Sequence, residues 1–421
     1  MSASRIVFVN RFFHPDHSAT SQLLSDLAFH LSEQGWSVRV VTSRLRYEDP
    51  SVQLDSGEWI GGVSVRRVWT SRLGRARLLH RAVDCMTFYV TATWRLWRET
   101  RRGDVVVTKT DPPLFGWLAA VVCGLKGARL VHWVQDVFPE IASAYGLRVA
   151  KGPLGLCIRA MRNWAYKRAA VCCVLGEGMA AHLRGEGIPA ERLRCLPNWS
   201  DGRGVYPVEL SNNRLVEDWG LGDRFVVGYS GNLGRGHDAG TLLAAARNLS
   251  DREAVAFLLV GGGANRPWLE SEADRSGLSN MVFQPYQARE KLAESLSAAD
   301  VHLVSLRSDM EGLMFPSKLF GVLAAGRPVI FIGDTEGEIA ELLQEYDCGL
   351  AVAEGDSEAL AEAIRELERS PERVAAMGRR ARQLFEARFD REIALAGWEE
   401  ALLEVAGKPS PATVTTEVAK Q

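Results

Sequence analysis

Short apolar runs alternate with amphipathic stretches along most of the chain. Residues 6–9 have the pattern of a buried strand, and the leucines of residues 20–34 recur at helical spacing until Gly35 stops the helix. This alternation is typical of an α/β protein in which helices cover a parallel sheet. Strands are predicted in the first half at residues 6–9, 38–41, 63–68, 105–107, 130–134 and 171–175.

The pattern restarts after a turn-rich segment near residue 200. Further strands are predicted at residues 225–229, 254–260, 281–284, 301–305 and 328–332. A length of 421 residues is enough for two such domains. The predicted organisation is an N-terminal Rossmann-like domain over 1–199, a linker over 200–222, a second Rossmann-like domain over 223–388, a helix over 389–406 and a disordered tail over 407–421.

Charge is distributed unevenly, although 50 basic and 52 acidic residues give a net charge of only -2. Residues 1–200 hold 27 basic and 16 acidic residues, whereas residues 201–421 hold 23 and 36. The first half should therefore favour an anionic surface or substrate more than the second. An apolar fraction of 47% excludes a disordered or fibrous chain. No basic stripe with a reading motif points to nucleic acid.

Residues 78–97 form a candidate membrane-interface helix. Their apolar positions recur at helical spacing, and arginines flank them on both sides. Such a helix can place arginines on lipid phosphates and tryptophans at the boundary; the alternative is a core helix with solvated ends. The apolar run 114–125 is too short to span a bilayer. The first ten residues lack the apolar stretch of a signal peptide, and the seven cysteines show no metal-ligand spacing, so a reducing cytoplasm is expected.

Candidate polar residues follow two predicted strands of the first half. The loop after residues 6–9 contains His14, Asp16, Ser18 and Thr20 and leads into a helix whose free N–H groups could face an anion; alternatively, Ser18 or Thr20 only caps that helix. Asp136 follows the strand at 130–134, where a carboxylate could orient or deprotonate an acceptor hydroxyl, or could cap the next turn.

The second half contains two glycine-rich turns and one lysine-containing segment after its strands. Glycines let the backbone approach a phosphate, and neither turn fits a dinucleotide fingerprint or a P-loop. In residues 311–328 a helix is predicted to begin near a serine–lysine pair, which could hold a diphosphate without a metal; the alternative is a capped helix with a surface lysine. The residues concerned are Gly231, Asn232, Gly234 and Arg235, then Gly262, and then Glu311, Ser317 and Lys318.

These segments together resemble glycosyltransferase family 4, the retaining group whose two Rossmann-like domains face a cleft in the GT-B fold. The resemblance covers about residues 4–400 and rests on the order of Ser-Gly-Asn at 230–232, Val-Gly-Gly-Gly at 260–263, Pro-Ser-Lys at 316–318 and Ala-Gly-Arg-Pro at 325–328. Trp-Val-Gln-Asp-Val-Phe-Pro-Glu at 133–140 and Pro-Asn-Trp at 197–199 are similar to the bacterial surface-polysaccharide branch, which includes fucosamine transferases of O-antigen and colanic-acid-type clusters.

The resemblance implies a role for each candidate residue. Catalytic or diphosphate-binding roles fall on Arg235, Lys318, Glu311 and, on the acceptor side, Asp136. The acceptor-side loop holds His14, Asp16, Ser18 and Thr20. The other donor-binding positions are Gly231, Asn232, Gly234, Gly262, Phe283, Gln284, Met314, Phe315, Pro316 and Ser317.

The implied reaction transfers a sugar with retention from a nucleoside-diphosphate sugar to a lipid-linked or saccharide acceptor. An N-acetylated hexosamine on a uridine carrier is expected, with no metal and no cofactor, at the inner face of the plasma membrane. The helix at 389–406 should cross back to the first domain. The family's usual pair of glutamates, eight positions apart, falls on Leu313 and Gly321, so the carboxylate that commonly holds the ribose is missing. The alternatives are an inactive sugar-nucleotide-binding scaffold and a sugar-nucleotide 2-epimerase.

Overall fold

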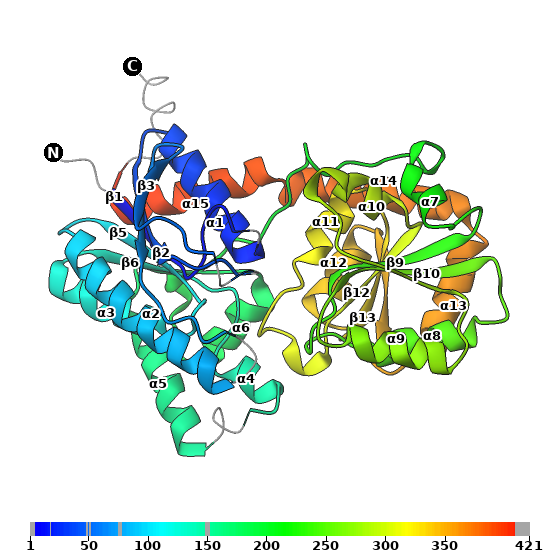
Figure 1. The fold of residues 1–421 in the computed structure, drawn as a ribbon, viewed down its shortest axis with the longest axis horizontal. Coiled ribbons are helices and arrows are strands. Elements are labelled where there is room, and N and C mark those ends of the chain that lie inside the picture. Colours follow the sequence, from blue (N-terminus) through cyan, green and yellow to red (C-terminus); the bar gives the residue numbers. More distant parts are fainter. Residues whose placement is uncertain are drawn as a thin grey trace. The chain divides into compact units, whose positions relative to one another are not determined.

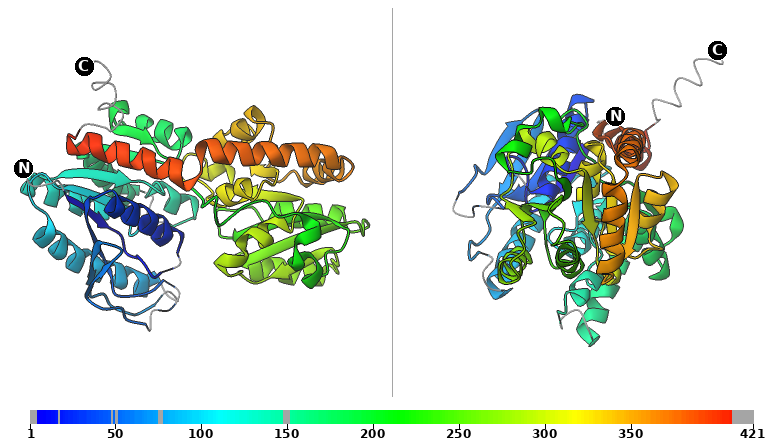
Figure 2. Two further views of the ribbon diagram at one scale, coloured as in Figure 1. Left: turned by 90° about the horizontal axis from the view of Figure 1, so that it is seen from above. Right: turned by 90° about the vertical axis from the view of Figure 1, so that its right-hand side faces the viewer.

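The protein consists of two compact α/β units. The computed structural model describes residues 5–16, 18–47, 49, 52–74, 78–147 and 152–408 (Figures 1 and 2). The first unit comprises Met1–Leu196 together with Leu395–Gln421, and the second comprises Pro197–Ala394. The predicted alternation of strands and helices is confirmed in both units.

The first unit is built on an eight-stranded sheet within the described residues. Its order is β3-β4-β2-β1-β5-β6-β7-β8, so the central strands β1 and β5 lie side by side. Neighbouring strands other than β3 are parallel, and therefore their carboxyl ends meet at one edge. The strands are β1 (Arg5–Val9), β2 (Ser37–Ser43), β3 (Gly57–Ile60), β4 (Val63–Val68), β5 (Val105–Lys109), β6 (Arg129–Trp133), β7 (Val171–Val174) and β8 (Leu193–Cys195).

The edge strand β3 is an antiparallel addition to this sheet that the sequence did not predict. β3 pairs antiparallel with β4 through a tight turn at Gly61 and Gly62, both of which have positive φ angles. Glycine suits this turn because two-residue hairpins need left-handed backbone. The strand itself is exposed or half-buried throughout. It therefore lacks the continuous apolar run that marks the buried strands in the sequence.

Helices cover both faces of this sheet (Figure 1). Because α1 joins strands in the opposite direction to α2, α3 and α5, right-handed crossovers place it on the opposite face. α15 lies beside α1, where His30 Nε2 is 3.5 Å from Glu399 (Figure 2), and its Trp398 packs on Trp133 of β6 with ring centroids 4.4 Å apart. The helices are α1 (Ala19–Glu33), α2 (Leu78–Glu99), α3 (Phe115–Lys126), α4 (Glu140–Ala144), α5 (Gly152–Arg168), α6 (Glu177–Gly185) and α15 (Arg391–Ala406).

The second unit contains a six-stranded sheet in the order β11-β10-β9-β12-β13-β14, with all pairs parallel. The chain moves outward in one direction from β9 and in the other direction from β12. The strand order therefore reverses between these two strands, which is where open parallel sheets bind ligands. The strands are β9 (Phe225–Asn232), β10 (Val255–Gly262), β11 (Met281–Gln284), β12 (Val301–Ser305), β13 (Val329–Gly333) and β14 (Gly349–Ala353).

The helices of the second unit bury a continuous apolar core against this sheet. α8 packs against α13, and α14 packs against both α11 and α13. The core includes Leu242, Phe257, Leu303 and Ile364, all almost fully buried. The helices are α7 (Arg214–Asp218), α8 (Gly240–Asn248), α9 (Arg266–Arg275), α10 (Leu292–Ser297), α11 (Lys318–Ala324), α12 (Glu338–Glu345), α13 (Ser357–Glu368) and α14 (Pro371–Arg388).

The segment 200–222, predicted as a linker, is folded into the second unit. It contains α7, whose first turn is capped by the Asn213 side chain at 3.1 Å from the Leu215 N–H. Asn213 also donates to the Glu294 carbonyl at 2.7 Å. Leu215 and Leu221 are buried. At the other end of the chain, residues 409–421 of the predicted tail lie outside the described residues.

Candidate functional site

The donor-side candidates meet where the strand order of the second unit reverses. Lys318, at the start of α11, lies against the end of β9. Its Nζ contacts the Tyr229 hydroxyl and lies 4.3 Å from the centre of the Tyr229 ring. Nζ also donates to the Asn232 carbonyl at 3.3 Å and lies 3.2 Å from His237 Nε2. Sequence positions about 80 to 90 residues apart are thus brought to one ammonium group.

His237 has a defined role in holding Lys318. Its Nδ1 lies 2.6 Å from the Ser305 carbonyl at the end of β12, and a carbonyl can only accept, so Nδ1 carries the proton. Nε2 is then left with a lone pair that accepts from Lys318. Burial, followed by the nearby charge of Lys318, lowers the pKa of His237 to about 3. The imidazole therefore stays neutral at physiological pH. It adds no positive charge that would repel the protonated amine of Lys318.

Burial lowers the pKa of Lys318 to about 7. Its hydrogen-bond partners are a hydroxyl, a carbonyl and an imidazole, and none of these three groups carries a negative charge. Burial also raises the pKa of Tyr229, so its hydroxyl keeps its proton. A cation without a charged partner is poised to gain one from a ligand, because an opposite charge at close range favours the protonated amine. The arrangement therefore fits a phosphate group.

Glycines at the ends of β9 and β10 let the two strand ends approach each other closely beside Lys318. Gly231 has a φ of 111°, and a Cβ there would lie 3.9 Å from Lys318 Cε. A Cβ on Gly261 would come within 2.3 Å of the Gly231 carbonyl oxygen. Gly262 accepts from the Leu233 N–H at 2.7 Å, and its Cα faces the Tyr286 ring. Gly234 accepts from the His237 N–H at 3.1 Å, which closes the turn.

The predicted base-binding residues lie beside an arginine that sequence reasoning missed. Phe283 and Gln284 end β11. The Arg266 guanidinium, from α9, lies 5.8 Å from the centre of the Phe283 ring and donates to the Gln284 carbonyl at 2.6 Å. It also bonds to the Gly261 carbonyl. Arg266 thus ties the ends of β10 and β11 together, and nothing in the local sequence distinguishes it from a surface arginine.

The remaining donor-side predictions lie on or near α11. Arg235 is exposed in the turn after β9, and its carbonyl accepts from Arg307 at 3.4 Å. Met314 lies half-buried in the loop, and the Phe315 ring stacks on Phe320 with centroids 5.5 Å apart. Ser317 is the N-cap of α11, although its side chain makes no capping bond. Buried Pro316 accepts from the Leu319 N–H through its carbonyl at 3.1 Å.

Glu311 and Gly321 contact the neighbouring helices α12 and α10, respectively. The Glu311 carboxylate accepts from the Glu338 N–H at 3.2 Å, at the first turn of α12. Burial raises the pKa of Glu311, and the acidic groups Glu338, Asp334 and Glu341 add to the effect. A Cβ on Gly321 would lie 3.4 Å from Leu296 of α10. The roles of Glu311 and Ser317 in donor binding stay predictions.

In the first unit, loops after β1, β5 and β6 meet at the carboxyl edge. Lys109, at the end of β5, donates to the Thr20 carbonyl at 3.0 Å and lies 3.6 Å from the centre of the Trp133 ring. The N–H groups of Gln135 and Asp136 donate to the Thr110 hydroxyl at 3.1 and 3.3 Å. Asp136 is therefore placed at the edge by a hydrogen bond between two strand ends.

Asp136 shares this edge with charged groups that sequence reasoning missed. Burial, followed by the charge of Asp111, raises the pKa of Asp136 to about 6, and Lys109 partly offsets this. Burial lowers the pKa of Lys109 well below its ordinary value. A carboxyl group that titrates near neutral pH can exchange a proton with a hydroxyl. In the sequence, Lys109 is marked only by its position at the end of an apolar strand.

The loop from His14 to Thr20 is held mainly by its own backbone and by Asp16. The buried Asp16 carboxylate accepts from the Ser18 N–H at 2.8 Å and from the Tyr47 N–H. Ser18 is the N-cap residue of α1, but its side chain makes no capping hydrogen bond. The Ser18 hydroxyl therefore does not cap the helix. The exposed His14 accepts from Arg67 through its carbonyl at 2.8 Å. The acceptor roles of these residues stay predictions.

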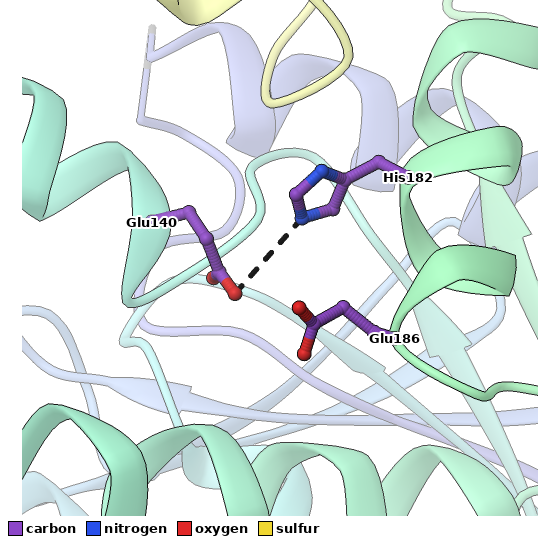
Figure 3. A group of neighbouring side chains, drawn as sticks. All are labelled: Glu140, His182 and Glu186. Atoms are coloured by element: carbon purple, nitrogen blue, oxygen red, sulfur yellow. Dashed lines mark ion pairs between the residues drawn. The ribbon is translucent and has the colours of Figure 1, made fainter.

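A separate group of Glu140, His182 and Glu186 has ligand atoms close enough together to suggest a metal site (Figure 3). Two arginines of α5 already neutralise it: Arg162 lies 2.5 Å from Glu140 and 3.2 Å from Glu186, and Arg159 lies 3.0 Å from Glu140. Burial would raise the pKa of Glu140, but hydrogen bonding from His182 and the charge of Arg162 outweigh it and hold the pKa at about 2. The group therefore acts as an ion-pair network joining α4, α5 and α6.

The two Rossmann-like units, each with polar groups at the carboxyl edge of its sheet, define the GT-B class of glycosyltransferases. Comparison with known families agrees. A model for a glycosyl transferase 4-like domain matches residues 20–199, and a model for glycosyl transferases group 1 matches residues 224–370. Together these matches span well over half of the chain. The protein belongs to glycosyltransferase family 4.

Curated relatives cover most of the chain. It is 29% identical over 374 residues to the putative colanic acid biosynthesis glycosyl transferase WcaI of Escherichia coli, spanning 84% of this chain and 89% of that protein. It is also 29% identical over 302 residues to the probable glycosyltransferase WbjE of Pseudomonas aeruginosa, spanning 70% of this chain and 74% of that protein.

Solved structures share the fold at lower identity. Sucrose-phosphate synthase from Thermosynechococcus elongatus aligns with a TM-score of 0.78 at 19% identity, over 96% of this chain and 99% of that chain. Anabaena HepE in complex with UDP-glucose aligns with a TM-score of 0.70 at 17% identity, over 95% and 99% of the two chains.

Proposed function

We propose that this glycosyltransferase moves a sugar, with retention of anomeric configuration, from a uridine-diphosphate sugar to a lipid-linked saccharide in the synthesis of a bacterial surface polysaccharide. Support comes from the relative WcaI, named for colanic acid biosynthesis, and from HepE, whose complex contains UDP-glucose. An N-acetylated hexosamine is proposed as the sugar, on the similarity of residues 133–140 to the fucosamine transferase branch.

The observation that carries the proposal is the half-buried amine of Lys318. It lies at the point where the strand order of the second unit reverses, beside Gly231 at the end of β9. Its hydrogen-bond partners, a hydroxyl, a carbonyl and an imidazole, are neutral, so a bound diphosphate would supply its counter-charge. Charge-assisted bonds of this kind are roughly twice as strong as neutral ones.

The proposed reaction needs no metal, since Lys318 and Arg235, which is exposed in the turn after β9, would offer positive charge to the leaving diphosphate. The first unit would bind the acceptor, with Asp136 orienting its hydroxyl. Asp136 holds its carboxyl group at the edge of the sheet with a pKa of about 6. In the proposed step the hydroxyl oxygen of the acceptor forms the new bond to the anomeric carbon. The bond from that carbon to the diphosphate breaks, and the hydroxyl proton passes to the departing phosphate.

Thermal unfolding with nucleotides tests the donor assignment. A ligand that binds only the folded state raises the unfolding temperature. UDP and UDP-N-acetylglucosamine should raise it, by several degrees at about 100 times the dissociation constant, and EDTA should not remove the shift. ADP and GDP should give smaller shifts.

Three outcomes would contradict the proposal in whole or in part. A shift that EDTA abolishes would show that the diphosphate is held through a metal. No shift with any nucleotide or nucleotide sugar would favour a scaffold that has lost its donor site. A shift with GDP exceeding that with UDP would change the carrier and leave the diphosphate site intact.

A further inference from the structure

One helix of the first unit is apolar on the side that faces away from the sheet. α2 buries Phe88, Ala92 and Leu96 completely. Its outward positions carry a second apolar stripe, in which exposed fractions range from 37% to 72%. A helix packed on one face of a water-soluble protein is ordinarily polar on the other. The stripe consists of Leu79, Val83, Met86, Val90, Trp94 and Trp97, and is called here the α2 stripe.

The α2 stripe continues onto the neighbouring helices. α3 packs against both α2 and α5, and the three helices lie next to one another in Figure 1. Lys126 of α3 lies 4.1 Å from the centre of the Trp97 ring. On α5, Arg168 lies 4.4 Å from the centre of the half-exposed Trp164 ring, which in turn packs against Trp117 of α3. Cations are therefore held beside aromatic rings at two places on this layer.

The charge that this layer exposes is positive. Arg81 and Arg98 are exposed near the two ends of α2. The acidic residues of α2 are both buried and paired: Asp84 accepts from Ser71 at 2.5 Å, and Glu99 pairs with Arg39 and Arg95. The sequences of α3 and α5 contain no acidic residue. Exposed tryptophans and cations with no exposed carboxylate between them match an anionic lipid surface, where the rings sit at the headgroup level.

We propose that the α2 stripe lies in the headgroup region of an anionic bilayer and holds the first unit against the membrane. No helix of the described ranges is long and apolar enough to cross a membrane, so the contact is with the surface. The proposal deepens the proposed function, on which it rests for its purpose, by naming the surface that brings the enzyme to a lipid-linked acceptor. Both Trp94 and Trp97 are exposed, as such a contact requires.

Co-sedimentation with vesicles tests the proposal on the full-length protein. The wild type should bind vesicles of phosphatidylcholine containing about 30% phosphatidylglycerol, and binding should weaken in about 0.5 M salt. The double variant Val90→Glu/Trp94→Glu should bind at least tenfold more weakly. Arg81→Gln/Arg98→Gln should weaken binding to the anionic vesicles and reduce its salt dependence. Trp268→Glu, an exposed tryptophan on α9 of the second unit, is the matched control and should bind as the wild type does.

Nucleotide binding separates failure of this inference from failure of the proposed function. All variants should retain the UDP-induced thermal shift of the wild type, which also shows that they are folded. The inference would be overturned if UDP raises the unfolding temperature of the wild type but the wild type does not bind anionic vesicles. That result would not contradict the donor site. Equal vesicle binding by wild type and Val90→Glu/Trp94→Glu would also overturn the inference. So would wild-type protein that forms a dimer that the double variant loses, since the α2 stripe would then join two copies of the chain.

Discussion

Replacing Lys318 with methionine is expected to reduce kcat/KM for sugar transfer about 100- to 1000-fold. Methionine keeps the length of the side chain but removes the charge that would face the departing diphosphate. Loss of one group that stabilises developing charge in a site of this kind costs roughly this factor. The measurement is the initial rate of UDP release from the donor in the presence of acceptor.

Two further variants make the Lys318 result specific. Lys291→Met removes an exposed lysine of the same unit and should leave the rate unchanged. Lys318→Arg keeps the charge and should recover part of the activity, although the planar guanidinium cannot reproduce the contacts with Tyr229 and His237. A Lys318→Met protein within tenfold of wild type, with a normal unfolding temperature, would show that the diphosphate binds elsewhere.

Replacing Asp136 with asparagine is expected to reduce kcat about 100-fold or more, because a neutral amide accepts the hydrogen bond of the acceptor's hydroxyl more weakly than a carboxylate does and orients it less well. Donor affinity should not change, since Asp136 belongs to the first unit and Lys318 to the second. Steady-state rates, together with the UDP-induced thermal shift, separate these two effects. Equal losses of rate and of UDP binding would contradict the acceptor role.

The pH dependence of the rate gives a second test of Asp136. Its pKa is raised to about 6, so the active carboxylate form is lost as the pH falls below that value, and the rate should fall with it. The acid limb should disappear in Asp136→Asn. In Asp111→Asn it should move to lower pH, because the charge of Asp111 is one of the causes that raise the pKa of Asp136. An acid limb that stays in place in both variants would assign it to another group.

The sequence predicted the strand framework and the position of Lys318 well. Buried parallel strands such as β5 and β10 carry continuous apolar runs, and the segment 311–328 placed Lys318 at the start of a helix, where the structure has it. The exposed strand β3 and the short β8 could not be predicted in this way, because neither is buried enough to need an apolar run.

The partners of the site residues could not be read from the sequence. Lys318 meets Tyr229 across 89 positions and His237 across 81, and Lys109 meets Thr20 across 89. These contacts depend on which strands lie side by side, which no local pattern specifies. The carboxylate of Glu311 likewise accepts from Glu338, 27 positions away, in the first turn of α12. Local sequence supplied the candidate residues, whose roles stay predictions, and the strand order determined which of them meet.

Calorimetric titration of UDP-N-acetylglucosamine is the most direct test of the central claim, that Lys318 receives the donor's diphosphate. Both phosphates of this ligand are esterified and do not titrate near pH 7. Because the pKa of Lys318 is about 7, most of the amine is neutral at pH 7.5, and a bound diphosphate should protonate it. Heats measured in two buffers of different ionisation enthalpy should therefore show net proton uptake on binding. Lys318→Met should bind more weakly and take up none. Binding by the wild type without proton uptake, or equal uptake by wild type and Lys318→Met, would contradict the account.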